Sequence, residues 1–315
     1  MSEQQTKIEI NLDSTVLSHS GCMLAIKRKV IDGYTEPRPG ASLNYGVAVH
    51  KYIDTMFQTH GHIPTATKAA MEAFNVPKED KYKSPHLSDP EHMITTAFNA
   101  WEMWVSKDEQ FQVLEINGKP CTEMTFSFPY YEDEWIKVNL CGTIDSIGKI
   151  KGGCHAIRDF KTTSTWDDKN YFKTYELSRQ LRFYVLALKI MSQRFPDSIL
   201  GRIGATSVGA FIDAIFIKPA ANENKYGRSD VYQYSEKDMA QFEITLGRFI
   251  LQLSHAIREN LYLKEGILNG QCETKWGKCL FWNCCTVDDN IAEILLKRDF
   301  VVRKFDPLRY NEVTN

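Results

Sequence analysis

The sequence predicts an α/β protein in which a mixed central sheet is flanked by helices, with helical additions at both ends. Three consecutive runs rich in β-branched and aromatic residues, at 122–130, 135–147 and 154–161, are expected to be strands. A helical segment at 175–195 and a fourth strand at 207–218 follow them. Strands joined through a helix in this way are typical of an α/β core.

Helices are expected on the N-terminal side of the core, over about 14–30, 43–60, 65–74 and from Ser88 to Trp104. The first of them carries Cys22 and ends in basic residues. The last begins with Ser88-Asp89-Pro90-Glu91, which supplies a capping residue, a first-turn proline and an acid.

On the C-terminal side, Ser235-x-x-Asp238 resembles a capping box that opens a long helix to about Lys264. A cysteine-rich run and a short helix near 291–297 follow it. We therefore expect a single domain over residues 1–315. Its parts would be an N-terminal helical part (14–110), the α/β core (120–220) and a C-terminal helical part (235–315).

The composition is that of a soluble globular protein, with 43% hydrophobic and 25% charged residues. No segment approaches the roughly 20 apolar residues that span a bilayer, and residues 1–11 lack the apolar core of a signal peptide. We expect a cytoplasmic protein. The net charge of −2 argues against a protein that coats nucleic acid through a general positive field. Local clusters such as Lys27-Arg28-Lys29 are most simply solvated surface.

The most informative residues are Asp145, Asp159 and Lys161. Side chains at i and i+2 of a strand share a face, so Asp159 and Lys161 project together while Phe160 points into the opposite layer. Asp145 lies near the end of the preceding strand, and a short connection would bring it beside Asp159. Two carboxylates with a backbone carbonyl, here that of Phe160, and several waters suit Mg²⁺. Such an ion activates water, and Lys161 would stabilise charge on a phosphate.

The alternative to a metal site is that Asp159 and Lys161 are exposed residues without a function on a strand edge, since Asp-x-Lys is a common tripeptide. An aspartate at the end of an apolar strand precedes this one, and Gln180-x-x-x-Tyr184 follows it in a helix. That context favours phosphodiester hydrolysis.

Gly142-x-x-Asp145, Asp159-x-Lys161-Thr162 and Gln180-x-x-x-Tyr184 resemble the consecutive motifs of the RecB-type branch of the PD-(D/E)XK nuclease superfamily. The resemblance implies a restriction-endonuclease-like core and a metal-dependent DNA nuclease. It implies that Asp145 and Asp159 bind metal and that Lys161 is catalytic. Gln180 and Tyr184 would lie beside the site and position it or the DNA.

Gly46-x-x-x-His50 lies upstream on an expected helix, where i and i+4 share a face. Taken alone, His50 reads as an ordinary helix histidine. The RecB-type branch carries a histidine at this motif as a further metal ligand, and a nitrogen ligand would raise tolerance for Mn²⁺ beside Mg²⁺. Glu123, at the start of the first strand, is a candidate additional acid.

Eight cysteines are present, four of them in the run Cys272-x6-Cys279-x4-Cys284-Cys285. In a cytosolic chain, clustered cysteines indicate metal before disulfide. Iron–sulfur members of the RecB-type branch, including the AddB nuclease domain and nucleases of CRISPR adaptation, place one cysteine before the core and three after it. The resemblance therefore implies a [4Fe–4S] cluster on Cys22, Cys272, Cys279 and Cys285, with Cys284 as a substitute for Cys285.

The chain departs from the family pattern at Cys272, because the second cysteine would fall where Trp276 stands. Cys272 reaches the cluster only if the loop of residues 273–278 bends back. Trp276, Phe281 and Trp282 would give an apolar shell. Since hydrolysis needs no electron transfer, we expect a structural role for the cluster. Free thiols with one zinc site are the alternative, and Cys121, Cys141 and Cys154 are interpreted as small core residues.

The expected partner is DNA with free ends or single-stranded regions, in recombination, repair or phage DNA metabolism. The chain has no Gly-x4-Gly-Lys-Ser/Thr loop, so any helicase or recombination motor would be a separate chain. Two other hypotheses stay open. One is a non-catalytic nucleic-acid-binding or assembly module, and the other is a redox or metal sensor built around the cysteines.

Overall fold

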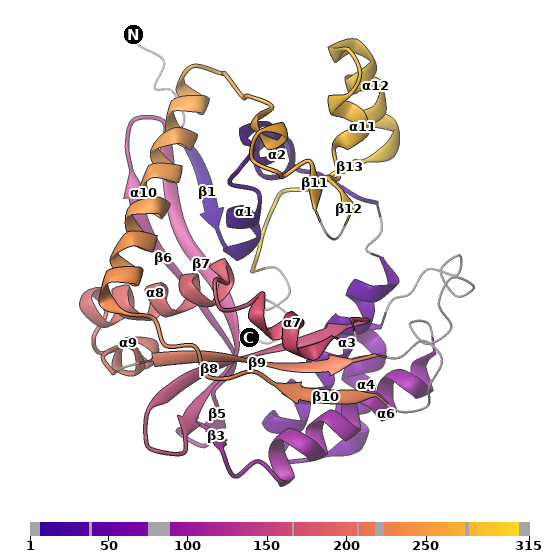
Figure 1. Ribbon diagram of the computed structural model, residues 1–315, viewed down its shortest axis with the longest axis vertical. Helices are drawn as coiled ribbons and strands as arrows, with labels where there is room; N and C mark the ends of the chain where they lie inside the picture. The colour runs from indigo at the N-terminus through magenta and orange to yellow at the C-terminus, as the bar shows by residue number, and fades with distance from the viewer. Residues whose placement is uncertain are drawn as a thin grey trace. The chain divides into compact units, whose positions relative to one another are not determined.

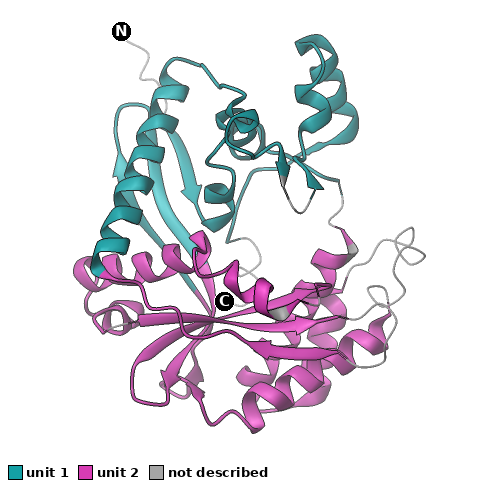
Figure 2. Ribbon diagram, viewed as in Figure 1, with its two compact units in different colours: residues 1–37, 125–142, 236–315 teal, residues 38–124, 143–235 magenta. Residues whose placement is uncertain are grey.

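The computed structural model describes residues 7–37, 40–74, 89–165, 167–206, 208–217, 224–274 and 277–308. The chain divides into two compact units (Figure 2). Unit 1 comprises residues 1–37, 125–142 and 236–315, and unit 2 comprises residues 38–124 and 143–235. Within the described ranges, no helix is both long enough and apolar enough to cross a membrane.

Unit 1 is built on a parallel pair of strands. β1 (Ile8–Leu12) runs beside the first part of β7 (Ile136–Ile150), with Ile8 opposite Ile136 and Leu12 opposite Leu140. β6 (Thr122–Glu132) precedes β7 in the chain and pairs with it, and a tight turn at Asp133 connects the two strands. The sequence interpretation missed β1, although Ile8, Ile10 and Leu12 alternate with polar residues as a half-buried strand requires.

The helix expected over 14–30 is interrupted. It consists of α1 (Ser14–Ser18), α2 (Met23–Ile26) and a π-helical turn, η1 (Lys27–Ile31). Cys22 precedes α2 in an extended conformation, with φ −153° and ψ 104°, and this breaks the helical path. Arg28 was interpreted as solvated surface, but its side chain is buried, with 7% exposure.

The C-terminal part of unit 1 begins with α10 (Glu236–Arg258). This helix buries a stripe of apolar side chains that includes Leu246, Phe249 and Leu253. α10 ends before the expected Lys264, and Asn260 takes a positive φ of 49°. The following elements are η4 (Glu265–Ile267), β11 (Glu273–Thr274), β12 (Gly277–Lys278), α11 (Trp282–Cys285), α12 (Asp289–Asp299) and β13 (Val301–Val302), which pairs with β2 (Tyr34–Thr35).

Unit 2 contains the mixed sheet that the sequence predicts (Figure 1). The second part of β7 is antiparallel to β8 (His155–Thr163), β8 is parallel to β9 (Val208–Phe216), and β9 is antiparallel to β10 (Lys225–Arg228). β3 (Phe111–Val113) pairs with the end of β7. The chain between Ile116 and Lys119 turns through a small hairpin of β4 (Glu115–Ile116) and β5 (Lys119–Pro120).

Three helices connect β8 to β9, as a parallel connection requires. They are α7 (Asp168–Lys173), α8 (Arg179–Arg194) and α9 (Ile199–Gly204). α8 begins later than the expected Tyr175, because the Ser178 hydroxyl accepts a hydrogen bond from the backbone N–H of Leu181 and caps the helix there. The sequence interpretation did not separate α7 and α9.

The N-terminal helices of unit 2 are α3 (Ala41–Gln58), α4 (Ile63–Ala73) and α6 (Pro90–Trp101), followed by a π-helical turn, η3 (Glu102–Ser106). These agree with the predicted helices. Asp89 caps α6 by accepting hydrogen bonds from the N–H groups of Glu91 and His92, while Ser88 lies outside the described residues. The three helices share one hydrophobic cluster, and Phe160 of β8 belongs to it.

A buried ionic network supports β8 next to Asp159. Arg158 is fully buried, and its Nη1 lies 3.9 Å from carboxylate oxygens of both Asp108 and Asp213. Arg228 binds the same two carboxylates more closely, at 2.8 Å and 2.6 Å. The Arg158 guanidinium also lies 4.6 Å from the ring centroid of Phe160. Each charge in this interior is therefore paired.

Candidate active site

Asp159 and Lys161 lie on one face of β8, and Phe160 packs into the hydrophobic cluster on the other face. Lys161 Nζ lies 2.5 Å from Oδ2 of Asp159. The Asp159 side chain is fully buried, and its Oδ1 has no hydrogen-bond partner among the described residues. A buried carboxylate oxygen without a donor has room in its coordination for a cation.

Asp145 lies inside β7, five residues before its end, rather than near the end as expected. The pairing of β7 with β8 begins at Ser146, opposite Arg158, so Asp145 lies one residue outside the paired segment. Oδ2 of Asp145 instead accepts a hydrogen bond of 2.7 Å from the backbone N–H of Phe160. The side chain thus crosses to β8 and lies beside the Asp159 strand segment, as the sequence argument requires.

His50 reaches the same region from α3. Its Nδ1 lies 3.5 Å from Oδ2 of Asp145. Gly46 explains how α3 approaches so closely, since a Cβ at this position would lie 3.1 Å from the hydroxyl of Thr162 on β8. The Gly46-x-x-x-His50 spacing therefore combines close packing with a side chain directed at the carboxylates.

Glu123 completes a group of three: its carboxylate, His50 and Asp145 each offer a ligand atom within 4.8 Å of the others. Glu123 stands at a positive φ of 46°, a strained conformation for a residue with a side chain. Asp54, which the sequence interpretation missed, adds a further acid nearby and accepts a hydrogen bond of 2.7 Å from Thr122. Asp54 lies four residues after His50, so helical spacing was the available signal.

The crowded acids disfavour one another's charges. Burial, and then the charges of Asp145 and Asp54, raise the pKa of Glu123 well above its usual value. Burial also raises the pKa of Asp145, and it raises the pKa of Asp159 to about 6 against the opposing effect of Lys161. A divalent cation would relieve this repulsion, because it favours the ionised form of each carboxyl.

The two basic groups of the site differ in charge. Burial and the neighbouring Lys161 lower the pKa of His50 to about 4, so the imidazole is neutral at pH 7 and keeps a lone pair for a metal. Burial opposes the charge of Lys161, but Asp159 and Asp145 outweigh it and raise the Lys161 pKa. Lys161 is therefore a fixed cation beside the acids.

Gln180 and Tyr184 lie one turn apart on α8, and the Gln180 amide donates a hydrogen bond of 3.1 Å to the Tyr184 hydroxyl. Burial, followed by the charge of Asp159, raises the pKa of Tyr184. The phenol is therefore protonated at neutral pH and within electrostatic reach of the acids. All the residues predicted for the hydrolytic site belong to unit 2.

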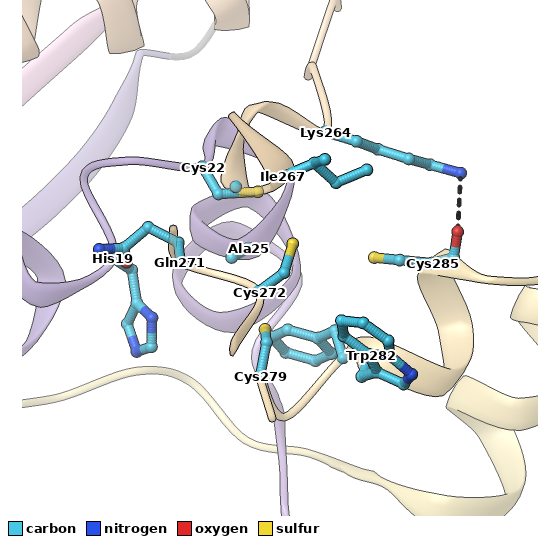
Figure 3. Close-up of a pocket in the computed structure, with 12 residues that line it drawn as sticks. His19, Cys22, Ala25, Lys264, Ile267, Gln271, Cys272, Cys279, Trp282 and Cys285 are labelled. Carbon is cyan, nitrogen blue, oxygen red and sulfur yellow. Dashed lines mark hydrogen bonds between the residues drawn. The ribbon is translucent and has the colours of Figure 1, made fainter. Parts of the chain in front are cut away.

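The cysteines predicted to hold iron lie together in unit 1. Cys22, Cys272, Cys279 and Cys285 all line one pocket, and their sulfur atoms surround a common space (Figure 3). The chain reaches this arrangement because Cys272 follows the turn after η4 and Cys279 follows β12, with the backbone N–H of Cys279 donating to the carbonyl of Cys272 at 2.8 Å. This fold-back brings Cys272 to the pocket. Trp276, expected in the apolar shell, lies outside the described residues.

Gly266 leaves room beside the sulfurs, because a Cβ there would lie 3.0 Å from Sγ of Cys272 and 3.3 Å from Cβ of Cys22. Cys284 is not among the residues that line the pocket. It is buried behind them, in a hydrophobic cluster that includes Cys22, Phe281 and Ala292. Phe281 and Trp282 line the pocket as expected.

Of the three remaining cysteines, Cys121 and Cys141 are buried as predicted, whereas Cys154 is exposed. Its interpretation as a core residue was wrong, because Cys154 lies between the turn at Gly152 and Gly153, both at positive φ, and the first residue of β8.

The neighbouring sulfurs affect the protonation of Cys272. Burial, and then the thiolates of Cys22, Cys279 and Cys285, raise the pKa of Cys272. Zinc would hold four sulfurs about 3.8 Å apart, given Zn–S bonds of about 2.3 Å. Among the described residues, three or more His, Cys, Asp or Glu ligand atoms lie within 4.8 Å of one another only in the group around Asp145. Any three of the four pocket sulfurs therefore include a pair more than 4.8 Å apart, which is wider than the spacing around one zinc ion.

Comparison with known families agrees with this geometry. Residues 18–286 match the PD-(D/E)XK nuclease superfamily, and the chain belongs to that superfamily. Membership implies a nuclease of the metal-dependent kind, and the mixed sheet with flanking helices is the fold expected of it.

No curated protein matches the chain. Among solved structures, the crystal structure of SSO0001 is similar over 73% of this chain and 84% of that one, with 9% identity and a TM-score of 0.25.

Proposed function

We propose that the protein is a Mg²⁺- or Mn²⁺-dependent deoxyribonuclease of the RecB-type branch, with the residues around Asp145 and Lys161 as its active site. The observation that carries the proposal is the meeting of β7, β8 and α3 in unit 2. There His50 lies 3.5 Å from Asp145, and Lys161 lies 2.5 Å from a buried Asp159 with an unpartnered oxygen.

The donor set suits a hard divalent cation. Asp145, Asp159 and the backbone carbonyl of Phe160 supply oxygen, and neutral His50 supplies nitrogen. Glu123 is close enough to be an additional ligand or to hold a water. When bound, such a cation lowers the pKa of a coordinated water and offsets charge on the phosphate.

The protein's own groups would supply the remaining functions. Lys161 is held charged by Asp159 and Asp145, so it can stabilise negative charge on the reacting phosphate without a change of protonation. Tyr184, oriented by Gln180, presents a protonated phenol beside the site and can orient the acids or the DNA strand.

The proposal is tested with linear double-stranded, linear single-stranded and circular DNA, each with Mg²⁺ or Mn²⁺. Asp145→Ala and Lys161→Ala are each expected to lower the cleavage rate about a hundredfold or more. Asp197→Ala and Lys68→Ala remove the same residue types from exposed positions of unit 2 and should cleave as the wild type does.

Full activity in both site variants would exclude this site. DNA binding without cleavage under every condition would favour the non-catalytic binding or assembly module. A preference for linear over circular DNA is expected, since we propose action on free ends or single strands in recombination, repair or phage DNA metabolism, with any helicase as a separate partner.

We further propose that Cys22, Cys272, Cys279 and Cys285 hold a structural [4Fe–4S] cluster. The wide spacing of the sulfurs and the space left by Gly266 support a group larger than a single zinc ion. Cys285 is preferred to Cys284 because it lines the pocket. Protein purified without oxygen should contain about four irons and absorb near 400 nm; stoichiometric zinc without iron would overturn the cluster.

A further inference from the structure

The iron–sulfur pocket of unit 1 has a buried cation beside it that the proposed ligands leave unexplained. Arg28 donates a hydrogen bond of 3.2 Å from Nη1 to Sγ of Cys285. Its side chain is 7% exposed, and its guanidinium lies 5.7 Å from the ring centroid of Phe281, which lines the same pocket. A desolvated arginine needs a negative partner, because isolated buried charge is costly.

No carboxylate is paired with Arg28 within the described residues at ion-pair distance; the partner that the structure provides is the sulfur of Cys285. By contrast, the neighbouring Lys27 pairs with Asp32 at 2.7 Å. Arg28 would thus be satisfied electrostatically when Cys285 is a thiolate, the form in which a cysteine binds metal.

The backbone prepares this contact. Arg28 projects from the π-helical turn η1, where the helix that starts at α2 widens. Such turns are rare and frequently occur at functional sites. Cys22, the first proposed ligand, stands immediately before α2, so one short segment carries both a ligand and the cation that faces another ligand.

We propose that Arg28 is a positioning residue for the iron–sulfur cluster: it holds the Cys285 thiolate and raises the reduction potential of the cluster. This rests on the proposed cluster. Four thiolates give the oxidised cluster a charge of −2, and uptake of one electron gives −3, with no bond formed or broken. A fixed positive charge that donates to a ligand sulfur favours the more negative state.

The test uses full-length protein purified without oxygen and titrated with dithionite as the one-electron donor. Arg28→Gln is expected to lower the ratio of reduced to oxidised cluster about tenfold at a given ambient potential, which is about 59 mV for a one-electron couple. Arg28→Lys keeps the charge, so its reduction potential should lie between those of the wild type and Arg28→Gln. Arg258→Gln removes an exposed arginine of unit 1 that pairs with Glu259 and should leave the potential unchanged.

A wild-type preparation without an iron–sulfur spectrum would overturn the cluster itself. A wild-type cluster whose potential is the same in Arg28→Gln would overturn only the role of Arg28.

If Arg28→Gln does not assemble a cluster, the role of Arg28 is tested on the wild-type protein instead. Protein labelled with ¹⁵N-arginine and reduced with dithionite should show electron–nuclear coupling between the cluster and an arginine nitrogen, because Nη1 lies 3.2 Å from the ligand sulfur. Coupling supports the proposal, and its absence overturns it.

Discussion

At the scale of single residues, the hydrolytic site carries more acids than its cations balance. Asp54, Glu123, Asp145 and Asp159 surround His50, which is neutral at pH 7, and Lys161. Lys51 lies 3.6 Å from Asp54 and offsets that acid in part. Burial raises the pKa of the other three acids, and the charges of neighbouring acids add to that effect. A divalent cation would favour the ionised form of each carboxyl.

His50 should affect the choice between metals. Because its imidazole is neutral, it can bind through nitrogen, and a nitrogen ligand favours Mn²⁺ over Mg²⁺. His50→Ala is therefore expected to lower the ratio of Mn²⁺-supported to Mg²⁺-supported cleavage, by about tenfold. His62→Ala removes an exposed histidine of the same unit and serves as the control. An unchanged ratio in His50→Ala would exclude His50 as a ligand.

At the scale of secondary-structure elements, the sequence predicts those features that depend on residues close together along the chain. The alternation in β7 and β8 fixes which face carries Asp159 and Lys161, and the cap at Asp89 fixes the start of α6. β10 was missed because four residues with a glycine carry no strand pattern by themselves. Glu123 was a candidate from its position, but its closeness to His50 depends on how α3 packs against β8, which spacing along the chain does not encode.

The turn between β6 and β7 gives a prediction for acid stability. Partial burial alone would raise the pKa of Asp133, but hydrogen bonds from Ser254 and from the N–H groups of Ile136 and Trp135 outweigh it and lower the pKa to about 2. A lowered folded-state pKa stabilises the fold above the unfolded value of about 4. The contribution is lost as the pH falls from about 4 to about 2.

Asp133→Asn should therefore lower the free energy of unfolding at pH 7, by roughly 2 kcal/mol. The difference between variant and wild type should shrink as the pH is lowered below about 4. Urea unfolding at a series of pH values measures this. A difference that stays constant from pH 6 to pH 3 would show that the charge of Asp133 does not contribute.

At the scale of the whole molecule, the cysteine pocket joins segments that are far apart along the chain. Cys22 lies near the start of the described residues and Cys272–Cys285 near their end, and the chain between them includes all of unit 2. A crosslink across so long a loop restricts the unfolded chain, and a metal centre that forms only in the folded state adds its binding free energy to stability. The sequence shows which cysteines are available. It does not show that Cys272 reaches the pocket, because that depends on the fold-back at β11 and β12.

A shared centre makes a prediction about additivity. If Cys22 and Cys272 bind one cluster, then losing either ligand removes most of the cluster's contribution, and losing both removes little more. Cys22→Ser and Cys272→Ser should each lower the temperature of thermal unfolding, and the double variant should unfold close to the less stable single variant. Independent buried thiols would instead give additive decreases. Cys154→Ser, at an exposed cysteine, should unfold at the wild-type temperature. Iron content measured on the same samples connects the stability change to the cluster, since a decrease without loss of iron would assign it to packing alone.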